Sequence, residues 1–221
     1  MNILLRRLIW FIMLLPAVYL AVIWNQIPQT VPMHFDMKGT VDRYGTKNEL
    51  LIMTAILAAA NMLTYLIILN VYKIDPKKYA AQNKERLQRI GFSVALYIAA
   101  ISAMLIYEIS HNRVNMTMKF VFVAMGLLFA LLGNNMYNLK PNYFAGMRLP
   151  WTLENEDNWR ATHHLAGRLW FFGGLIFAVI ALLFNGEWTM YLAFAILSTL
   201  ILIPVIYSYR YYRRQNKKID A

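Results

Sequence analysis

Six apolar blocks alternate with polar segments along the 221 residues of the chain. An α-helix needs about 20 mainly apolar residues to cross the hydrocarbon core of a bilayer. The blocks predict helical spans over residues 8–23, 49–72, 91–109, 118–136, 169–184 and 188–209. The expected fold is therefore that of an all-α, polytopic integral membrane protein with six transmembrane helices.

The first block follows Arg6 and Arg7, as the apolar part of a signal peptide would. Its apolar run continues to Trp24, and Pro28 follows where a cleavage site would have small residues. We therefore expect a retained span, kinked at Pro16 because proline lacks the N–H of a helical hydrogen bond.

Composition agrees with the membrane class. Hydrophobic residues make up 59% of the chain, whereas soluble domains have about 45–50%. A net charge of +11 would suggest nucleic-acid binding in a soluble protein, but in a membrane protein Lys and Arg set the orientation. We therefore expect no direct contact with nucleic acid. The absence of cysteine excludes disulfides, thiolate catalysis and cysteine-based metal sites.

Lys and Arg are unevenly divided between the two faces that six spans define. The face with both termini carries 17 of the 22, distributed over the two ends of the chain, residues 73–90 and residues 133–168. The other face carries Lys38, Arg43, Lys47, Arg113 and Lys119. The positive-inside rule therefore predicts an N-in/C-in protein of the cytoplasmic (inner) membrane, with 73–90 as a basic loop at the cytoplasmic interface.

The segment over residues 25–48 lies on the outer face in this topology. Two prolines predict extended backbone at its start. His34 and Asp36 share a face of an extended chain because they are two residues apart, and Asp42 follows. The spacing matches no common zinc pattern, so we predict no metal site and treat the three residues as candidate contacts for an external ligand. The alternative is a compact loop in which His34 and Asp42 bond to the backbone of the loop.

The central segment, Gly133 to Gly167, is too polar to span the bilayer and contains two tryptophans, two histidines and a cluster of acids. Helix-breaking residues predict turns in its first half: Pro141, Gly146 and Pro150. Thr152 is expected to cap a short helix that begins at Leu153, and Glu156 is expected to pair with Arg160 at the i, i+4 spacing.

Trp159, His163 and Gly167 then follow at i, i+4 and i+8, on one helix face that should lie on the membrane or against the bundle. Arg148 has no acid near it in the sequence, which makes it a candidate for binding a phosphate or a helix C-terminus. The candidate contact residues of this segment are Arg148, Trp151, Trp159 and His163.

Histidines and acids close together suggest catalysis, but the known catalytic patterns do not occur. The chain has no His-Glu-x-x-His, no Gly-x-Ser-x-Gly and no phosphate-cradling glycine loop. We predict no enzymatic activity, no catalytic residue and no cofactor. Asn61, Asn70 and Ser102 are expected to form interhelical hydrogen bonds within the spans, and Glu108 is consistent with a structural or a functional role.

Two sets of residues resemble a known family. The first set lies in the outer segment: Pro28, Val31, Pro32, His34, Phe35, Gly39, Asp42, Gly45 and Lys47. The second lies in the central segment: Gly133, Asn134, Pro141 to Phe144, Gly146, Arg148, Pro150 to Leu153, Trp159, Thr162, His163 and Gly167. The second set is similar to the signature of the SdpI family, and the first to a domain of unknown function often found at the N-terminus of that family. Leu149 and His164 depart from the usual pattern.

The resemblance implies three regions: an N-terminal domain over 1–72, the basic loop 73–90, and an SdpI-like four-span region over 91–221. The best-known member protects a cell from a secreted, membrane-active killing peptide and holds a small transcriptional repressor at the membrane when the toxin is present. The resemblance therefore implies an immunity or signal-transduction protein, with an extracytoplasmic toxin peptide and a cytoplasmic repressor as expected partners.

Two alternatives stay open. A small transporter or channel would need polar side chains at mid-membrane, and the residues near that depth are Asn61, Thr64, Ser102 and Ser198. A membrane-embedded, metal-dependent enzyme would use His163 or His34 as a base or metal ligand.

Overall fold

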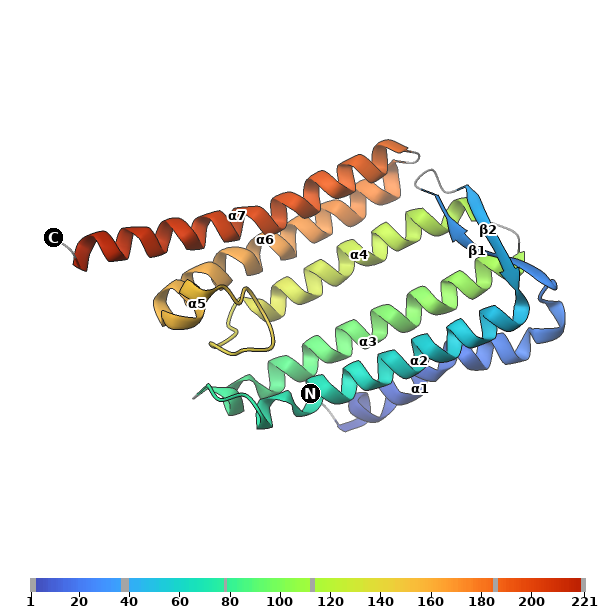
Figure 1. Ribbon diagram of the computed structural model, residues 1–221, viewed down its shortest axis with the longest axis horizontal. Coiled ribbons are helices and arrows are strands. Elements are labelled where there is room, and N and C mark those ends of the chain that lie inside the picture. The colour runs from blue at the N-terminus through green and yellow to red at the C-terminus, as the bar shows by residue number, and fades with distance from the viewer. Residues whose placement is uncertain (1–2, 37–39, 78, 112–113, 185–186, 220–221) are drawn as a thin grey trace.

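The computed structural model describes residues 3–36, 40–77, 79–111, 114–184 and 187–219 (Figure 1). Six long helices dominate it: α1 Ile3–Val22, α2 Lys47–Asn70, α3 Ala80–His111, α4 Val114–Met136, α6 Glu156–Leu183 and α7 Glu187–Ile219. All six contain a segment long and apolar enough to cross a membrane. This confirms the predicted class of an all-α, six-span membrane protein.

Shorter elements connect the long helices. Two 3-10 turns, η1 Trp24–Gln26 and η2 Val71–Lys73, follow α1 and α2. The five-residue helix α5, Pro150–Glu154, precedes α6. The outer segment forms an antiparallel hairpin of β1 Thr30–Phe35 and β2 Val41–Thr46.

Helices α3 and α6 begin earlier than the apolar pattern predicts. The expected loop 73–90 is wrong over its second half, because α3 starts at Ala80 and continues without a break into the span. Residues 80–90 contain Ala, Gln, Lys, Glu and Arg, which all have high helix propensity, and no proline or glycine. Hydropathy therefore located the membrane-crossing part and missed the polar turns that extend it.

The alternative for residues 25–48 was a compact loop that caps the helix ends, and the segment does cap them, as a β-hairpin. Thr30 pairs with Thr46 and Val31 with Gly45, and register shifts follow around His34. Val31 is fully buried and packs in a cluster with residues of α1, α2 and α3 and with the two isoleucines that flank η1: Leu20, Leu50, Ile106, Ile109, Ile23 and Ile27. The hairpin therefore covers one end of the first three helices (Figure 1).

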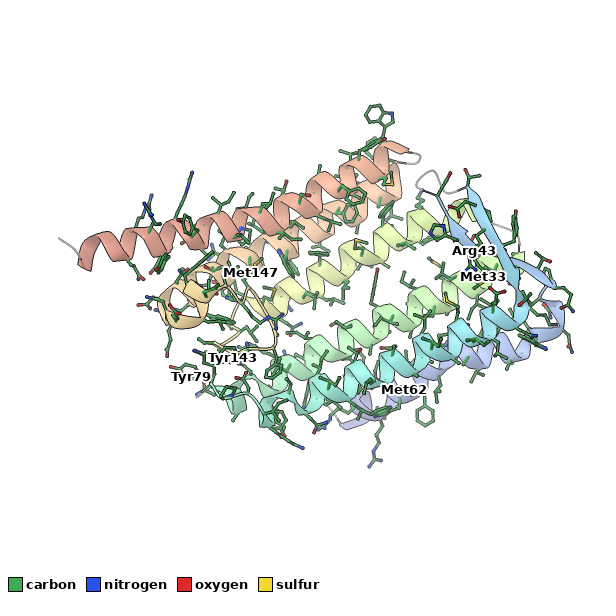
Figure 2. The ribbon with its side chains drawn as sticks, viewed as in Figure 1. Met33, Arg43, Met62, Tyr79, Tyr143 and Met147 are labelled. Carbon is green, nitrogen blue, oxygen red and sulfur yellow. The ribbon has the colours of Figure 1, made fainter. Side chains whose placement is uncertain are left out.

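The two ends of the molecule carry different elements. The start of α1 and the end of α7 lie at the end opposite the hairpin, as an even number of spans requires (Figure 1). In Figure 2, Met33 and Arg43 mark the hairpin end, whereas Tyr79, Tyr143 and Met147 lie together at the other end. We call the hairpin end the outer end and the opposite one the inner end, following the charge distribution.

Helices α4 and α6 approach each other closely through glycines. A Cβ added to Gly174 would lie 2.5 Å from the carbonyl oxygen of Gly126, and one added to Gly133 would lie 2.5 Å from the backbone nitrogen of Phe171. Small residues allow such backbone contact, which supplies van der Waals energy where lipid provides no hydrophobic drive. The pair forms the closely packed centre of the C-terminal half.

Polar side chains inside the spans behave in two ways. Asn61 donates from Nδ2 to the carbonyl oxygen of Ala95 at 3.0 Å, which confirms the predicted interhelical bond between α2 and α3. For Asn70 and Ser102 the prediction was wrong. Asn70 donates to Leu66, and Ser102 to Ile98, both in their own helices.

Candidate functional site

The inner end is built around His163, which lies on α6 and is fully buried. The backbone N–H of Met147 donates to its Nε2 at 2.9 Å. Nδ1 lies 2.8 Å from the carbonyl oxygen of Trp159. Because Nε2 accepts a hydrogen bond, the hydrogen must be on Nδ1, and the ring is the neutral Nδ1–H tautomer. His163 therefore holds the polar segment onto α6 and has no lone pair left for a base or a metal.

Trp159 extends the same contact by one helical turn. Its ring stacks on that of His163 with centroids 4.0 Å apart, and its Nε1–H donates to the carbonyl oxygen of Leu139 at 2.7 Å. Gly167, one turn further on, contacts the backbone of Tyr137. The face predicted from the i, i+4, i+8 spacing therefore packs against the bundle and the polar segment.

We call residues 137–155, between α4 and α6, the motif loop. Asn142 is fully buried in it, and its Oδ1 accepts from the backbone N–H groups of Phe144 and Ala145 at 2.9 and 2.7 Å. Gly146 has a positive φ of 98°, and a Cβ there would overlap Nε2 of His163. The loop thus follows the surface of α6 with no room for a side chain at Gly146.

The predicted cap at Thr152 is wrong. Helix α5 begins at Pro150 with Leu149 as its N-cap, and Oγ1 of Thr152 accepts from the N–H of Leu149 at 3.0 Å inside the first turn. Proline is favoured at the first helical position because its missing N–H would have no partner there. A second cap, Asn155, accepts from the N–H of Asn158 at 2.8 Å and starts α6.

The other residues predicted in the central segment bond to groups other than His163. Arg148 is exposed and donates from Nη1 to the carbonyl oxygen of Tyr143 at 2.8 Å. Trp151 donates from Nε1 to Oγ of Ser208 on α7 at 3.0 Å. Arg160 pairs with Asp157 at 3.0 Å, so the predicted pairing of Arg160 with Glu156 is wrong.

Trp151 is also part of an aromatic contact with α7. Its ring lies 5.4 Å from that of Tyr209 and 6.2 Å from that of Tyr212. Asn158 donates to the carbonyl oxygen of Ser208 at 3.0 Å on the same side. The Pro-Trp-Thr-Leu run therefore attaches the motif loop to the last helix.

Residues 75–83 belong to the predicted basic loop 73–90, for which no contact with the central segment was expected, and they hold the motif loop from the N-terminal half. Asn83 bonds to both backbone groups of Lys140, each at 3.0 Å. Lys77 donates from Nζ to the carbonyl oxygen of Leu153 at 2.8 Å, and Tyr79 donates to Glu156 at 2.7 Å. These contacts join residues 57 to 77 positions apart, so local sequence patterns gave no signal for them.

Of the three candidate residues in the outer segment, His34 and Asp42 are in contact with each other, and Asp36 bonds elsewhere. His34 Nδ1 and Asp42 Oδ1 are 2.6 Å apart on the exposed hairpin, with 65% and 45% of the side chains accessible. The alternative in which they bond to the backbone is therefore wrong. Asp36 instead accepts from the N–H of Thr40 at 2.8 Å. Among the residues that the structure describes, no three His, Cys, Asp or Glu side chains form a metal-binding group.

Glu108 lies near this end on α3 and is 4% exposed. Its Oε2 has no hydrogen-bond partner among the described residues. Oδ1 of Asn61 and the hydroxyl of Tyr65 are also buried without a hydrogen-bond partner among the described residues.

The structure thus defines a six-span helical membrane protein with a folded hairpin at one end and a motif loop fixed between two helical halves at the other. Two family models match segments of the chain. Residues 138–208 match the SdpI/YfhL protein family, and residues 11–58 match a domain of unknown function, DUF1648. These matches confirm the resemblance of the central and outer segments to the SdpI family and to the domain often found with it.

Two relatives are similar to the chain. The immunity protein SdpI of Bacillus subtilis (strain 168) is 28% identical over 126 residues, which cover 56% of this chain and 58% of that protein. An uncharacterized protein of Archaeoglobus fulgidus is 34% identical over 67 residues, which cover 30% of this chain and 33% of that protein. Both alignments span less than two thirds of the relative. No solved structure matches the chain.

Proposed function

We propose that this protein is a non-enzymatic immunity or signal-transduction protein, which protects against or senses a membrane-active peptide. The observation that carries the proposal is the direct bonding of the motif loop and the start of α6 to residues 75–83. Those residues continue into α3, whose opposite end packs under the hairpin. The similarity to a protein named for immunity supports the same role.

The proposed mechanism uses the hairpin as the peptide contact. His34, Asp36 and Asp42 are exposed or half-buried on it and supply polar groups. A peptide that binds one arrangement of α1–α3 better than another shifts the equilibrium between them. Movement of α3 would then strain or release the bonds from Asn83 and Lys77, which changes the surface that the motif loop offers to a cytoplasmic repressor. The protein is N-in/C-in in the cytoplasmic membrane on this proposal.

The test is survival of a sensitive host that expresses the protein, challenged with membrane-active peptides from the protein's own source. The outer variant is His34→Ala with Asp42→Ala. Its matched control is Arg43→Gln, which changes an exposed charge on the same hairpin. Protection lost in the double variant and kept in the control is the expected result. Full protection in the double variant would contradict the role of the hairpin.

A second pair of variants separates signalling from protection. Lys77→Ala with Tyr79→Phe removes two side-chain bonds to the residues around α5 and leaves the long helices intact. Lys73→Ala is the control, because Lys73 bonds to Asn70 in its own half. We expect the first variant to impair recruitment of a cytoplasmic regulator, measured by co-purification with and without peptide. Unchanged recruitment would contradict the proposed route.

The transport and enzyme alternatives receive no specific support from the described residues. The space beside Asn61, lined also by Thr54 and Ser102, is too tight to hold a water molecule. His163 is occupied at both ring nitrogens.

A further inference from the structure

A polar pocket lies at the inner end, between the two helical halves, and the proposed function does not use it. Its volume is about 530 Å³. Side chains from three parts of the chain line it: Arg86 on α3, Lys140 in the motif loop, and Arg160 and His164 on α6, with Tyr79 and Tyr137 beside them. It is therefore a place where cations from both halves converge.

The cations have unused bonding capacity. In the part of the chain that the structure describes, neither Arg86 nor Lys140 forms an ion pair. The ammonium group of Lys140 lies 5.9 Å from the ring centroid of Tyr79, and its backbone is fixed by Asn83. Arg160 uses one guanidinium nitrogen for Asp157 and has further N–H donors.

The charge of the pocket suits a singly charged anion. Three cations and two carboxylates, Glu156 and Asp157, line it, which leaves a net charge of +1. The carboxylates already have partners, because Tyr79 donates to Glu156 and Arg160 pairs with Asp157. A phosphodiester carries one negative charge and accepts charge-assisted hydrogen bonds from Arg and Lys.

The depth of the pocket indicates where the phosphate comes from. Helix α6 has 28 residues and is about 42 Å long at 1.5 Å per residue. It therefore exceeds a hydrocarbon core of about 30 Å by roughly eight residues. Because Leu183 lies at the outer end, the excess is at the inner end, in the turns that carry Arg160. The pocket thus lies at the level of the lipid headgroups, where basic pockets between helices bind anionic lipids.

We propose that this pocket binds the phosphate group of an anionic lipid headgroup, with Arg86 and Lys140 as its principal cations and Arg160 as the third. A bound lipid would bridge α3 to the motif loop and to α6. A soluble phosphorylated compound is the other source of the same chemistry. The inference does not depend on the immunity role.

The test uses the full-length protein purified in a neutral detergent. Binding of phosphatidylglycerol is measured by native mass spectrometry and by the thermal shift that the lipid produces. Phosphatidylcholine, which has no net charge, and inorganic phosphate are measured in parallel. Arg86→Gln with Lys140→Gln is the binding variant, and Arg86→Lys with Lys140→Arg keeps both charges. Arg89→Gln is the matched control, because Arg89 lies one turn further along α3, outside the residues that line the pocket.

We expect wild type and Arg89→Gln to bind phosphatidylglycerol equally and more tightly than phosphatidylcholine. The uncharged double variant should bind at least about 10-fold more weakly, and the charge-conserving variant should recover most of the affinity. Equal binding by the uncharged variant, or an equal loss in Arg89→Gln, would overturn the site. Saturation by inorganic phosphate without any lipid binding would overturn the lipid source.

Discussion

At the level of single residues, the motif loop depends on the contact between Gly146 and His163. The positive φ of Gly146 and the missing Cβ let the backbone N–H of Met147 reach Nε2 of His163. A residue with a side chain would be strained in this conformation. Position 146 is therefore where a very small change should have a large effect.

Gly146→Ala is expected to destabilise the protein by about 2–5 kcal/mol. The positive φ costs about 1–2 kcal/mol for alanine, and displacing His163 leaves the partly buried N–H of Met147 without its acceptor, at about 1–3 kcal/mol. Thermal unfolding of the purified protein in detergent measures the effect. Gly91→Ala is the control, because its Cβ would first meet a side chain, that of Ile68, at 3.0 Å. If the Gly146→Ala protein has the same melting temperature as wild type, other contacts hold the motif loop in place.

Residues of this site differ in how far the sequence could predict them. Trp159, His163 and Gly167 share a face because of helical spacing, which is local and visible in the sequence. Asn83 bonds to Lys140 from another helix, and nothing local encodes that pairing. Thr152 was assigned as a cap because its residue type fits one, but Pro150 and Asn155 compete for the helix starts and fit them better.

At the level of elements, two neighbouring glycines of α6 differ in what a side chain added to each would meet. A Cβ on Gly174 would lie 2.5 Å from the carbonyl oxygen of Gly126 and 2.6 Å from the backbone nitrogen of Ala130. A Cβ on Gly173 would instead meet the end of the Leu200 side chain, also at 2.5 Å. Backbone cannot rotate away, whereas a leucine can change its rotamer.

Gly174→Ala should therefore force α4 and α6 apart and destabilise the protein by about 1–3 kcal/mol, as overpacking does. Gly173→Ala should stay within about 1 kcal/mol of wild type, since alanine also gains helix propensity of that size. Thermal unfolding and the yield of monodisperse protein compare the two variants. Equal melting temperatures for both would refute the close backbone contact.

The elements themselves were predicted to different extents. Hydropathy located all six spans because a helix that crosses the bilayer needs about 20 mainly apolar residues. The spans are helical because only a helix satisfies all of its own backbone polar groups in lipid. Hydropathy could not show that α3 begins at Ala80, because polar turns with high helix propensity have no apolar signal. The hairpin was missed because β1 contains Pro32 and its register shifts around His34, so no clean alternation marks it.

At the level of the whole molecule, the two ends are chemically distinct and connected. The outer hairpin rests on α1–α3, and the inner motif loop is bonded to α6, to α7 and to residues 75–83. Helices α3 and α4 contact each other and join the two halves. A response that starts at the hairpin can therefore reach the motif loop along α2 or α3 through residues 75–83, or through the contact of α3 with α4.

The orientation of these ends can be measured directly because the chain has no cysteine. Tyr44 is 61% exposed on the hairpin, and Arg213 is exposed near the end of α7. The excess of Lys and Arg at the inner end favours the cytoplasm for that end. A membrane-impermeant maleimide should therefore label Tyr44→Cys in intact cells and Arg213→Cys only after the membrane is permeabilised, with the cysteine-free wild type as background. Labelling of Arg213→Cys in intact cells, with Tyr44→Cys protected, would reverse the topology and place the phosphate pocket in the outer leaflet.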